Sequence, residues 1–274
     1  MTLAVILRRA IICGIFLTPF IPLIVANDFF FPFITGKNFT FRVIVEVITV
    51  LWVALACIDV TVRPRRSALL WATGAFVLSL LVSAIVGENF HKSFFSNFER
   101  MEGWLGLAHM GAFFLVITSV MQGEKMWRWF WNTSLGVSVA VGIYCVFQLA
   151  GLAEIHQGGT RIDATLGNAT YLAVYMLFHV FIALLALARW TNGNKLLQLT
   201  YVAIAVFDAV LIFYSATRGS ILGLAGGLML AGLVMVIWGR GMQKLRMAGA
   251  AMLVIVVLLG GALYAVKDTE YVKN

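Results

Sequence analysis

The sequence predicts an all-α, polytopic membrane protein with about nine transmembrane helices. Of the 274 residues, 62% are hydrophobic and only 12% are charged. Apolar windows of about 20 residues alternate with short charged segments, and a helix of that length crosses a hydrocarbon core of ~30 Å. Soluble proteins carry about twice this share of charged residues, so the composition excludes a soluble enzyme.

The apolar windows define the expected spans, which occupy residues 9–26, 41–60, 67–86, 104–122, 130–152, 169–188, 197–214, 219–238 and 247–266. Neither a repeat nor a linker rich in Pro, Gly or Ser divides them, so we expect a single membrane domain over residues 1–274. The first span follows Arg8 and Arg9 and mimics a signal peptide, but it lacks a cleavage site of the Ala-x-Ala kind. We therefore interpret it as an uncleaved span.

Basic residues are distributed unevenly between alternate loops, and this predicts the orientation. Loops on one side carry 12 Lys and Arg residues against two acidic residues, whereas the other side carries eight basic and eight acidic residues. Because Lys and Arg are retained in cytoplasmic loops, we expect the N-terminus in the cytoplasm and the C-terminus in the periplasm. The net charge of +8 is explained by these loops and does not indicate a nucleic-acid partner.

A long apolar stretch from Tyr201 to Trp238 contains only two charged residues, Asp208 and Arg218. As one helix it would extend for roughly 57 Å, nearly twice the hydrocarbon thickness. We expect a break at residues 215–220, where Ser, Thr and Gly favour a turn. Arg218 then caps a helical hairpin at the outer face, either as an interfacial anchor or as a ligand for a lipid-linked phosphate.

Two sets of small residues are interpreted as structural. Gly219, Gly223 and Gly227 share one face of the helix after the turn, which predicts close packing against a neighbouring helix. The three cysteines, Cys13, Cys57 and Cys145, all lie within apolar spans and read as small hydrophobic residues. No metal-binding or nucleotide-binding motif is present, so we expect neither a metal nor a cofactor.

The loops expected outside the cytoplasm are the longer ones and cover residues 27–40, 87–103 and 153–168. This difference in loop length suggests that the functional site lies on the outer side of the membrane. In the second loop, apolar residues at near-helical spacing predict an amphipathic helix in the membrane interface: Phe90, Phe94, Phe95, Phe98 and Met101. In the third loop, Asn168 and Thr170 suit the start of the following helix.

Four ionisable side chains fall inside the expected spans, where a charge needs a partner: Glu46, His109, His179 and Asp208. Glu46 lies one helical turn from Arg42, which predicts an ion pair. We interpret the two histidines as neutral core residues bonded to backbone or hydroxyl groups. Asp208 is too far from Arg218 along one helix and must find a partner on another helix, or water.

Three segments, in the order ERMEGWLGLAHM (residues 99–110), TRIDATLGNATYLAVYM (160–176) and FYSATRGSILGLAGG (213–227), carry a family resemblance. Together they resemble the O-antigen ligase and O-antigen polymerase superfamily of bacterial inner-membrane glycosyltransferases. The second resembles that family's GTFGNPNYLA stretch, with Leu166, Ala169 and Thr170 as departures. The third resembles the family's SRG hairpin, with Thr217 before the arginine.

The resemblance implies transfer of a glycan from a polyprenyl diphosphate carrier to a lipid or glycan acceptor at the periplasmic face, without metal or cofactor. Arg218 matches the family's hairpin arginine, and Arg161 and Arg100 lie within matching segments, so these three are the expected substrate-binding residues. The family's catalytic histidine lies in a large outer loop after the span that corresponds to 247–266, and this chain ends at YAVKDTEYVKN. We therefore expect the N-terminal two-thirds of a longer protein, with its catalytic residue unknown.

Two other classes of function stay open. A secondary transporter or lipid flippase would use Glu46, His109 and Asp208 along a proton or substrate path, although no inverted repeat is visible. A non-catalytic membrane subunit or fragment is the other alternative. All three place the chain among membrane lipids and need no nucleic acid.

Overall fold

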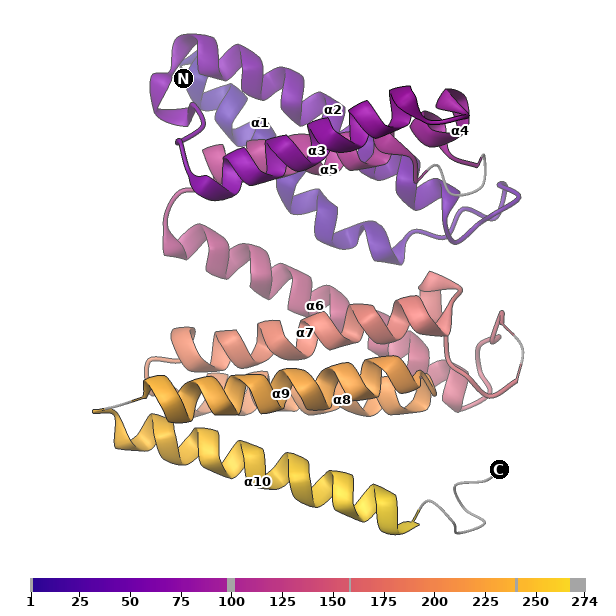
Figure 1. Cartoon of the computed structure of the whole chain (residues 1–274), viewed down its shortest axis with the longest axis vertical. Coiled ribbons are helices and arrows are strands. Elements are labelled where there is room, and N and C mark those ends of the chain that lie inside the picture. Colours follow the sequence, from indigo (N-terminus) through magenta and orange to yellow (C-terminus); the bar gives the residue numbers. More distant parts are fainter. Residues whose placement is uncertain (1, 98–101, 158, 240, 267–274) are drawn as a thin grey trace.

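The computed structural model describes residues 2–97, 102–157, 159–239 and 241–266, and every regular element in these ranges is helical. The long helices lie roughly side by side, joined by turns at two opposite ends of the molecule (Figure 1). In chain order the elements are α1 (Leu3–Leu17), η1 (Thr18–Leu23), α2 (Thr35–Ile58), η2 (Val60–Val62), α3 (Ala68–Val86), α4 (Phe90–Phe95), α5 (Trp104–Val120), α6 (Glu124–Leu149), η3 (Ala164–Leu166), α7 (Ala169–Trp190), α8 (Lys195–Tyr214), α9 (Arg218–Trp238) and α10 (Gln243–Val266).

Seven helices in the described part of the chain are long and apolar enough to cross a membrane, so the protein has the build of a multi-pass membrane protein. The remaining two expected spans correspond to α5 and α10. Helix α5 has 17 residues, which gives ~26 Å of helix against a core of ~30 Å. In α10 the described apolar part covers Leu245–Leu258. The total of nine spans therefore stays a prediction.

The first helix begins earlier than expected. Helix α1 starts at Leu3 rather than at residue 9, so Arg8 and Arg9 lie within it, and the span continues through η1 to Leu23. Part of the segment predicted as an interfacial helix is helical, as α4, while its position in the membrane interface stays a prediction. The last two of its expected apolar residues, Phe98 and Met101, lie outside the described residues.

Two hydrophobic clusters stabilise the bundle. One is built from α1, α2, α5 and the first turns of α6, with Ile15, Ile48 and Val116 at its centre. The other is built from the rest of α6 with α7 and α8, and partly buried residues of α9 pack against it. Trp131 of α6 packs against both clusters, and α6 lies between the two groups of helices in Figure 1. Helix α6 therefore joins the two halves.

Helix α9 packs through two of the three expected glycines. A Cβ atom at Gly227 would clash with the Phe181 ring, and one at Gly223 would lie 3.3 Å from Leu177, both on α7. A Cβ atom at Gly219, in the first turn of α9, would have no neighbour within 4 Å, so its expected role in packing is wrong.

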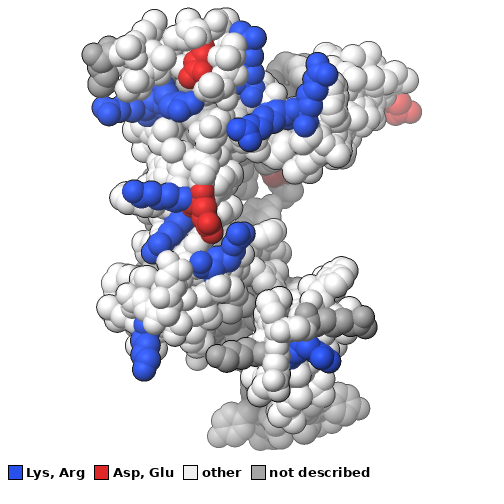
Figure 2. All heavy atoms as spheres, turned by 90° about the vertical axis from the view of Figure 1, so that its left-hand side faces the viewer, with Lys and Arg blue, Asp and Glu red and all other residues white. Residues whose placement is uncertain are grey.

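The start of α1 and the four turns that carry the basic excess all lie at one end of the bundle (Figure 1). Viewed from that end, the surface shows many Lys and Arg side chains and few acidic ones (Figure 2). Two ion pairs tie its segments together, Arg8–Asp59 at 3.8 Å and Arg189–Glu124 at 3.7 Å. The basic loops therefore share one face, while the cytoplasmic assignment of that face stays a prediction.

One acidic residue on the basic face, Asp59, has a lowered pKa. Asp59 accepts hydrogen bonds from the hydroxyl of Thr61 at 2.6 Å and from its backbone N–H at 2.9 Å. These bonds, with a smaller contribution from Arg8, hold the pKa of Asp59 below its usual value. The carboxylate thus stays charged at the start of η2.

Candidate functional site

The turn between α8 and α9 lies where the sequence predicts it. Helix α8 ends at Tyr214 and α9 begins at Arg218, so the break falls at residues 215–217. Ser215 is fully buried, and its hydroxyl donates to the carbonyl oxygen of Ile212 at 2.6 Å. Arg218 is exposed, and its side chain forms no ion pair with another described residue. Its guanidinium is accessible from outside the bundle.

Arg161 binds to this same turn. Its Nε donates to the carbonyl oxygen of Ser215 at 3.0 Å, and its Nη2 donates to the hydroxyl of Thr217 at 3.2 Å. The structure thus brings Arg161 and the start of α9 together across 54–56 residues of sequence. The third expected binding residue, Arg100, lies outside the described residues.

A buried carboxylate organises the loop that carries Arg161. Asp163 is 0% exposed, and its Oδ2 accepts the backbone N–H groups of His156 at 2.9 Å and Gln157 at 3.0 Å. Its Oδ1 accepts Nε2 of Gln148 at 2.7 Å and lies 3.4 Å from Nδ1 of His156. Several donors converge on one carboxylate. These bonds hold the loop in one conformation and so position the backbone of Arg161, two residues before Asp163.

Gln148, at the end of α6, completes this arrangement. Its Oε1 accepts the backbone N–H groups of Asp163 at 3.2 Å and Ala164 at 2.9 Å. Its Nε2 also donates to the carbonyl oxygen of Glu154 at 2.6 Å. The sequence gives no sign of this role, because a single glutamine near a helix end looks like any other interfacial polar residue.

Lys37 fixes the same loop to the segment between α1 and α2. Its ammonium donates to three backbone carbonyl oxygens, those of Ile24 at 2.6 Å, Phe33 at 2.9 Å and Thr165 at 2.7 Å. An ammonium group has three N–H donors, so all of them are used. Lys37 is thus a structural cation, although the sequence counts it among the outer basic residues.

The contact between these two outer segments is close and aromatic. The ring of Phe33 lies 4.5 Å from that of His156, and Gly167, at φ 62°, leaves no room for a Cβ beside Phe33. Next to it is a cavity of about 200 Å³. The residues that line it are Phe31, Pro32, Phe33, Ile34, Leu166, Gly167, Asn168 and Tyr171.

The start of α7 confirms one local prediction. Asn168 is the N-cap, and its side-chain oxygen accepts the backbone N–H groups of Thr170 at 2.8 Å and Tyr171 at 3.3 Å. This bond satisfies amide groups that have no partner within the helix. Asn168 therefore has a structural role that needs no substrate.

The membrane-embedded histidines both make the expected backbone bonds. Nδ1 of His179 lies 2.7 Å from the carbonyl oxygen of Tyr175, and Nε2 lies 2.8 Å from the hydroxyl of Ser134. A neutral ring satisfies both contacts, because Nδ1–H donates and Nε2 accepts. His179 is thus a core histidine, as predicted.

His109 differs because both of its ring nitrogens face acceptors. Nδ1 lies 2.7 Å from the carbonyl oxygen of Leu105, and Nε2 lies 3.1 Å from Oε1 of Glu46 on α2. This contact joins α2 to α5. Arg42 interacts electrostatically with Glu46, and the contact with His109 adds a partner on another helix that the sequence did not predict.

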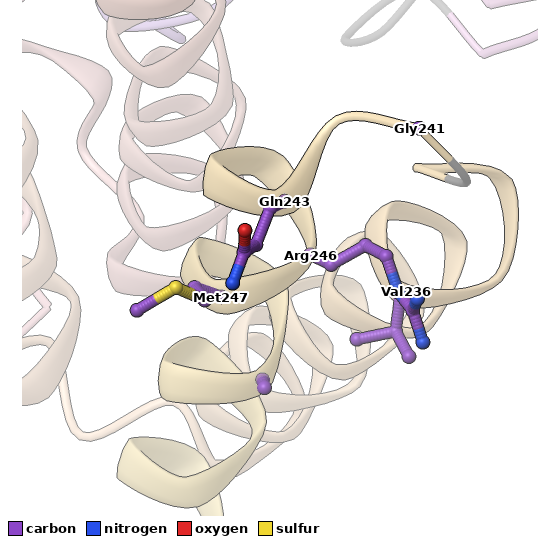
Figure 3. Close-up of a pocket in the computed structure, with 6 residues that line it drawn as sticks. Val236, Gly241, Gln243, Arg246 and Met247 are labelled. Carbon is purple, nitrogen blue, oxygen red and sulfur yellow. The ribbon is translucent and has the colours of Figure 1, made fainter.

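A larger cavity lies at the opposite end of the bundle, between the end of α9 and the start of α10. It measures about 550 Å³ and is lined by Val236, Gly241, Gln243, Arg246, Met247 and Ala250 (Figure 3). It belongs to the basic face, where the sequence predicts no site. Arg161 and Arg218, the two described cations predicted for substrate binding, are at the other end of the bundle, so we place the candidate site there.

The outer arrangement is suited to binding an anion. The first amides of a helix lack partners within it and favour negative charge, and Thr217, the N-cap of α9, makes no side-chain cap. Within the described residues, no group of three or more His, Cys, Asp or Glu side chains is placed to hold a metal ion. Comparison with protein-family models, curated proteins and solved structures finds no match to the chain.

Proposed function

We propose that the protein transfers a glycan from a polyprenyl diphosphate carrier to an acceptor hydroxyl at the outer face of a bacterial inner membrane. The observation that carries the proposal is the contact of Arg161 with the turn that opens α9 at Arg218. Both arginines are expected from the sequence to bind substrate. Arg161 donates to Thr217, the residue directly before Arg218, beside helix amides that no side chain caps. This is a site for a diphosphate at headgroup depth.

The reaction requires stabilisation of the negative charge that develops on the leaving group. The acceptor oxygen attacks the anomeric carbon, the bond from that carbon to the diphosphate oxygen breaks, and the diphosphate leaves with the electron pair. Cations already in place beside the diphosphate stabilise the charge that develops on it. Arg218 supplies a planar fork of donors for phosphate oxygens, and Arg161 holds the turn in position while its remaining N–H groups stay available.

Binding of the carrier is the most direct test, because it does not depend on which acceptor is used. The purified protein in nanodiscs should bind undecaprenyl diphosphate, and Arg218→Ala should weaken binding about 10- to 150-fold, since a hydrogen bond to a charged group contributes ~1.5–3 kcal/mol. Arg218→Lys should keep part of the affinity because it retains the charge but loses the fork.

Lys92→Ala is the matched control, because Lys92 is an exposed cation of α4 with no expected part in the site. It should leave binding unchanged. Normal binding by Arg218→Ala would make Arg218 an interfacial anchor and remove the proposed site. Transfer of glycan to acceptor, followed in detergent with the same variants, then distinguishes a ligase or polymerase from a protein that only binds the carrier.

An ion-coupled transporter is the second candidate, and the buried Asp208 of α8 favours it. A transporter moves substrate across the membrane of proteoliposomes without an acceptor, whereas a glycosyltransferase does not. Proton-driven flux that is lost in Asp208→Asn at an unchanged protein level would support transport over glycan transfer.

A further inference from the structure

A polar cluster inside the second hydrophobic core has no part in the proposed outer site. Asp208 of α8 is 0% exposed, and its Oδ2 lies 3.2 Å from the hydroxyl of Ser138 on α6. Its Oδ1 and the hydroxyl oxygen of Tyr175 on α7 are both buried and have no hydrogen-bond partner. Tyr175 packs against the same hydrophobic cluster, to which α6, α7 and α8 all contribute.

The hydrogen bonds of Ser138 indicate whether the carboxyl group of Asp208 carries a proton. The hydroxyl of Ser138 has one proton and two acceptors within reach, the carbonyl oxygen of Leu135 at 2.9 Å and Oδ2 of Asp208 at 3.2 Å. A serine within a helix often donates to the carbonyl of the preceding turn, and here that contact is the shorter one. If the proton lies there, the contact with Asp208 requires a second proton, carried by the carboxyl group.

Within the described part of the chain, no ion pair involves Asp208. The titratable side chains in the core around it are Tyr144 and Cys145 of α6, Tyr175 and His179 of α7 and Tyr201 of α8. His179 uses both ring nitrogens on Tyr175 and Ser134, in contacts that a neutral ring satisfies. Helix α9 has no ionisable residue after Arg218 at its start. An unpaired carboxylate in such surroundings is far less stable than a carboxylic acid.

A metal cation is a poorer ligand for this site than a proton. Sodium sites in membrane proteins draw on carbonyl oxygens freed where a helix is broken. Helices α6, α7 and α8 run without interruption through Ser138, Tyr175 and Asp208. Their carbonyl groups are therefore used within the helices, and only side-chain oxygens face the site.

We propose that Asp208 is a proton-binding site within the membrane. As a carboxylic acid it donates to Ser138. When the proton leaves, we expect the unpartnered hydroxyl of Tyr175 to turn toward the carboxylate and stabilise it. Asp208 lies six residues before the end of α8, or ~9 Å along the helix. Protonation thus acts on the helix that leads into the turn held by Arg161.

Infrared spectroscopy of the protein in nanodiscs tests this without any activity assay. At neutral pH the wild type should show the carbonyl band of a protonated carboxyl group, which shifts when the protein is labelled with [¹³C]aspartate. The band should be absent from Asp208→Asn and present in Glu88→Gln, a control at an exposed carboxyl group. It should fade reversibly as the pH is raised, and Tyr175→Phe should move the midpoint of this loss to higher pH.

Measurements on the same nanodisc samples can also contradict the proposal. Absence of an aspartate carbonyl band in the wild type at neutral pH would overturn the proposal, because the carboxyl group would then be charged. Thermal unfolding provides a second readout, and Asp208→Asn should unfold within a few degrees of the wild type, since the amide replaces a neutral acid of the same shape. If sodium chloride, compared with choline chloride, raises the unfolding temperature of the wild type but not of Asp208→Asn, the site binds a metal cation and the proton assignment is wrong.

Discussion

Replacement of Asp163 by Asn should open the outer loop while leaving the membrane helices folded. The carboxylate accepts two backbone N–H groups on Oδ2 and the amide of Gln148 on Oδ1. An asparagine has one acceptor oxygen, so in its better orientation the NH₂ group faces the Gln148 donor. Gln148 cannot simply rotate, because its own oxygen accepts two backbone N–H groups. A buried donor left without an acceptor costs about 1–3 kcal/mol, and the remaining bonds lose their charge assistance.

We therefore expect Asp163→Asn to lower the free energy of loop opening by about 2–4 kcal/mol, which raises the open population about 30- to 700-fold. Hydrogen exchange followed by mass spectrometry measures this at the amides of Asp163 and Ala164, both bonded to Gln148. Asp28→Asn is the control, because Asp28 is an exposed aspartate on the same outer face. Protection of residues 153–168 that stays within tenfold of the wild type would refute the role of the carboxylate.

The remaining predictions concern helix packing and orientation. Gly227→Leu should destabilise the protein by about 1–3 kcal/mol through the clash with the ring on α7, whereas Gly219→Leu should be tolerated; unfolding in detergent compares them, and equal losses would contradict the packing. Glu46→Gln should weaken the contact of α2 with α5 by about 0.5–1.5 kcal/mol in the same assay, and no change would mean that the histidine contact contributes nothing. A reporter that is active only outside the cytoplasm should work when fused after Asn274 and fail after Arg246, and the reverse pattern would invert the predicted orientation.

Local sequence signals predicted the parts of the fold that depend on neighbouring residues. The turn at 215–217 follows from Ser, Ala and Thr between two apolar stretches, and the start of α7 follows from the capping chemistry of Asn168. Helical spacing alone predicts which glycines share a face of α9, but not which of them a neighbouring side chain approaches. Phe181 and Leu177 approach Gly227 and Gly223, whereas a Cβ atom at Gly219 would meet nothing within 4 Å.

The organisation of the outer site depends on residues far apart in the chain, and for this reason the sequence could not predict it. Lys37 donates to Thr165 across 128 positions, and a lysine in a loop carries no sign of such a partner. The spacing predicts that Glu46 pairs with Arg42 on its own helix, but the carboxylate of Glu46 also contacts His109 of α5. Sequence spacing predicts partners one turn away, whereas partners on other helices follow only from the packing.

Helix α6 also constrains the order in which the chain assembles during synthesis. The first hydrophobic cluster includes Phe130 and is covered by Met126 and Trp127, all from the first turns of α6. Helices α1, α2 and α5 therefore enter the membrane before α6 covers the last exposed side of their shared hydrophobic cluster. Until α6 leaves the ribosome, lipid or an insertion factor must cover that surface. Insertion of α6 closes the first half and at the same moment provides the surface on which α7 and α8 build the second.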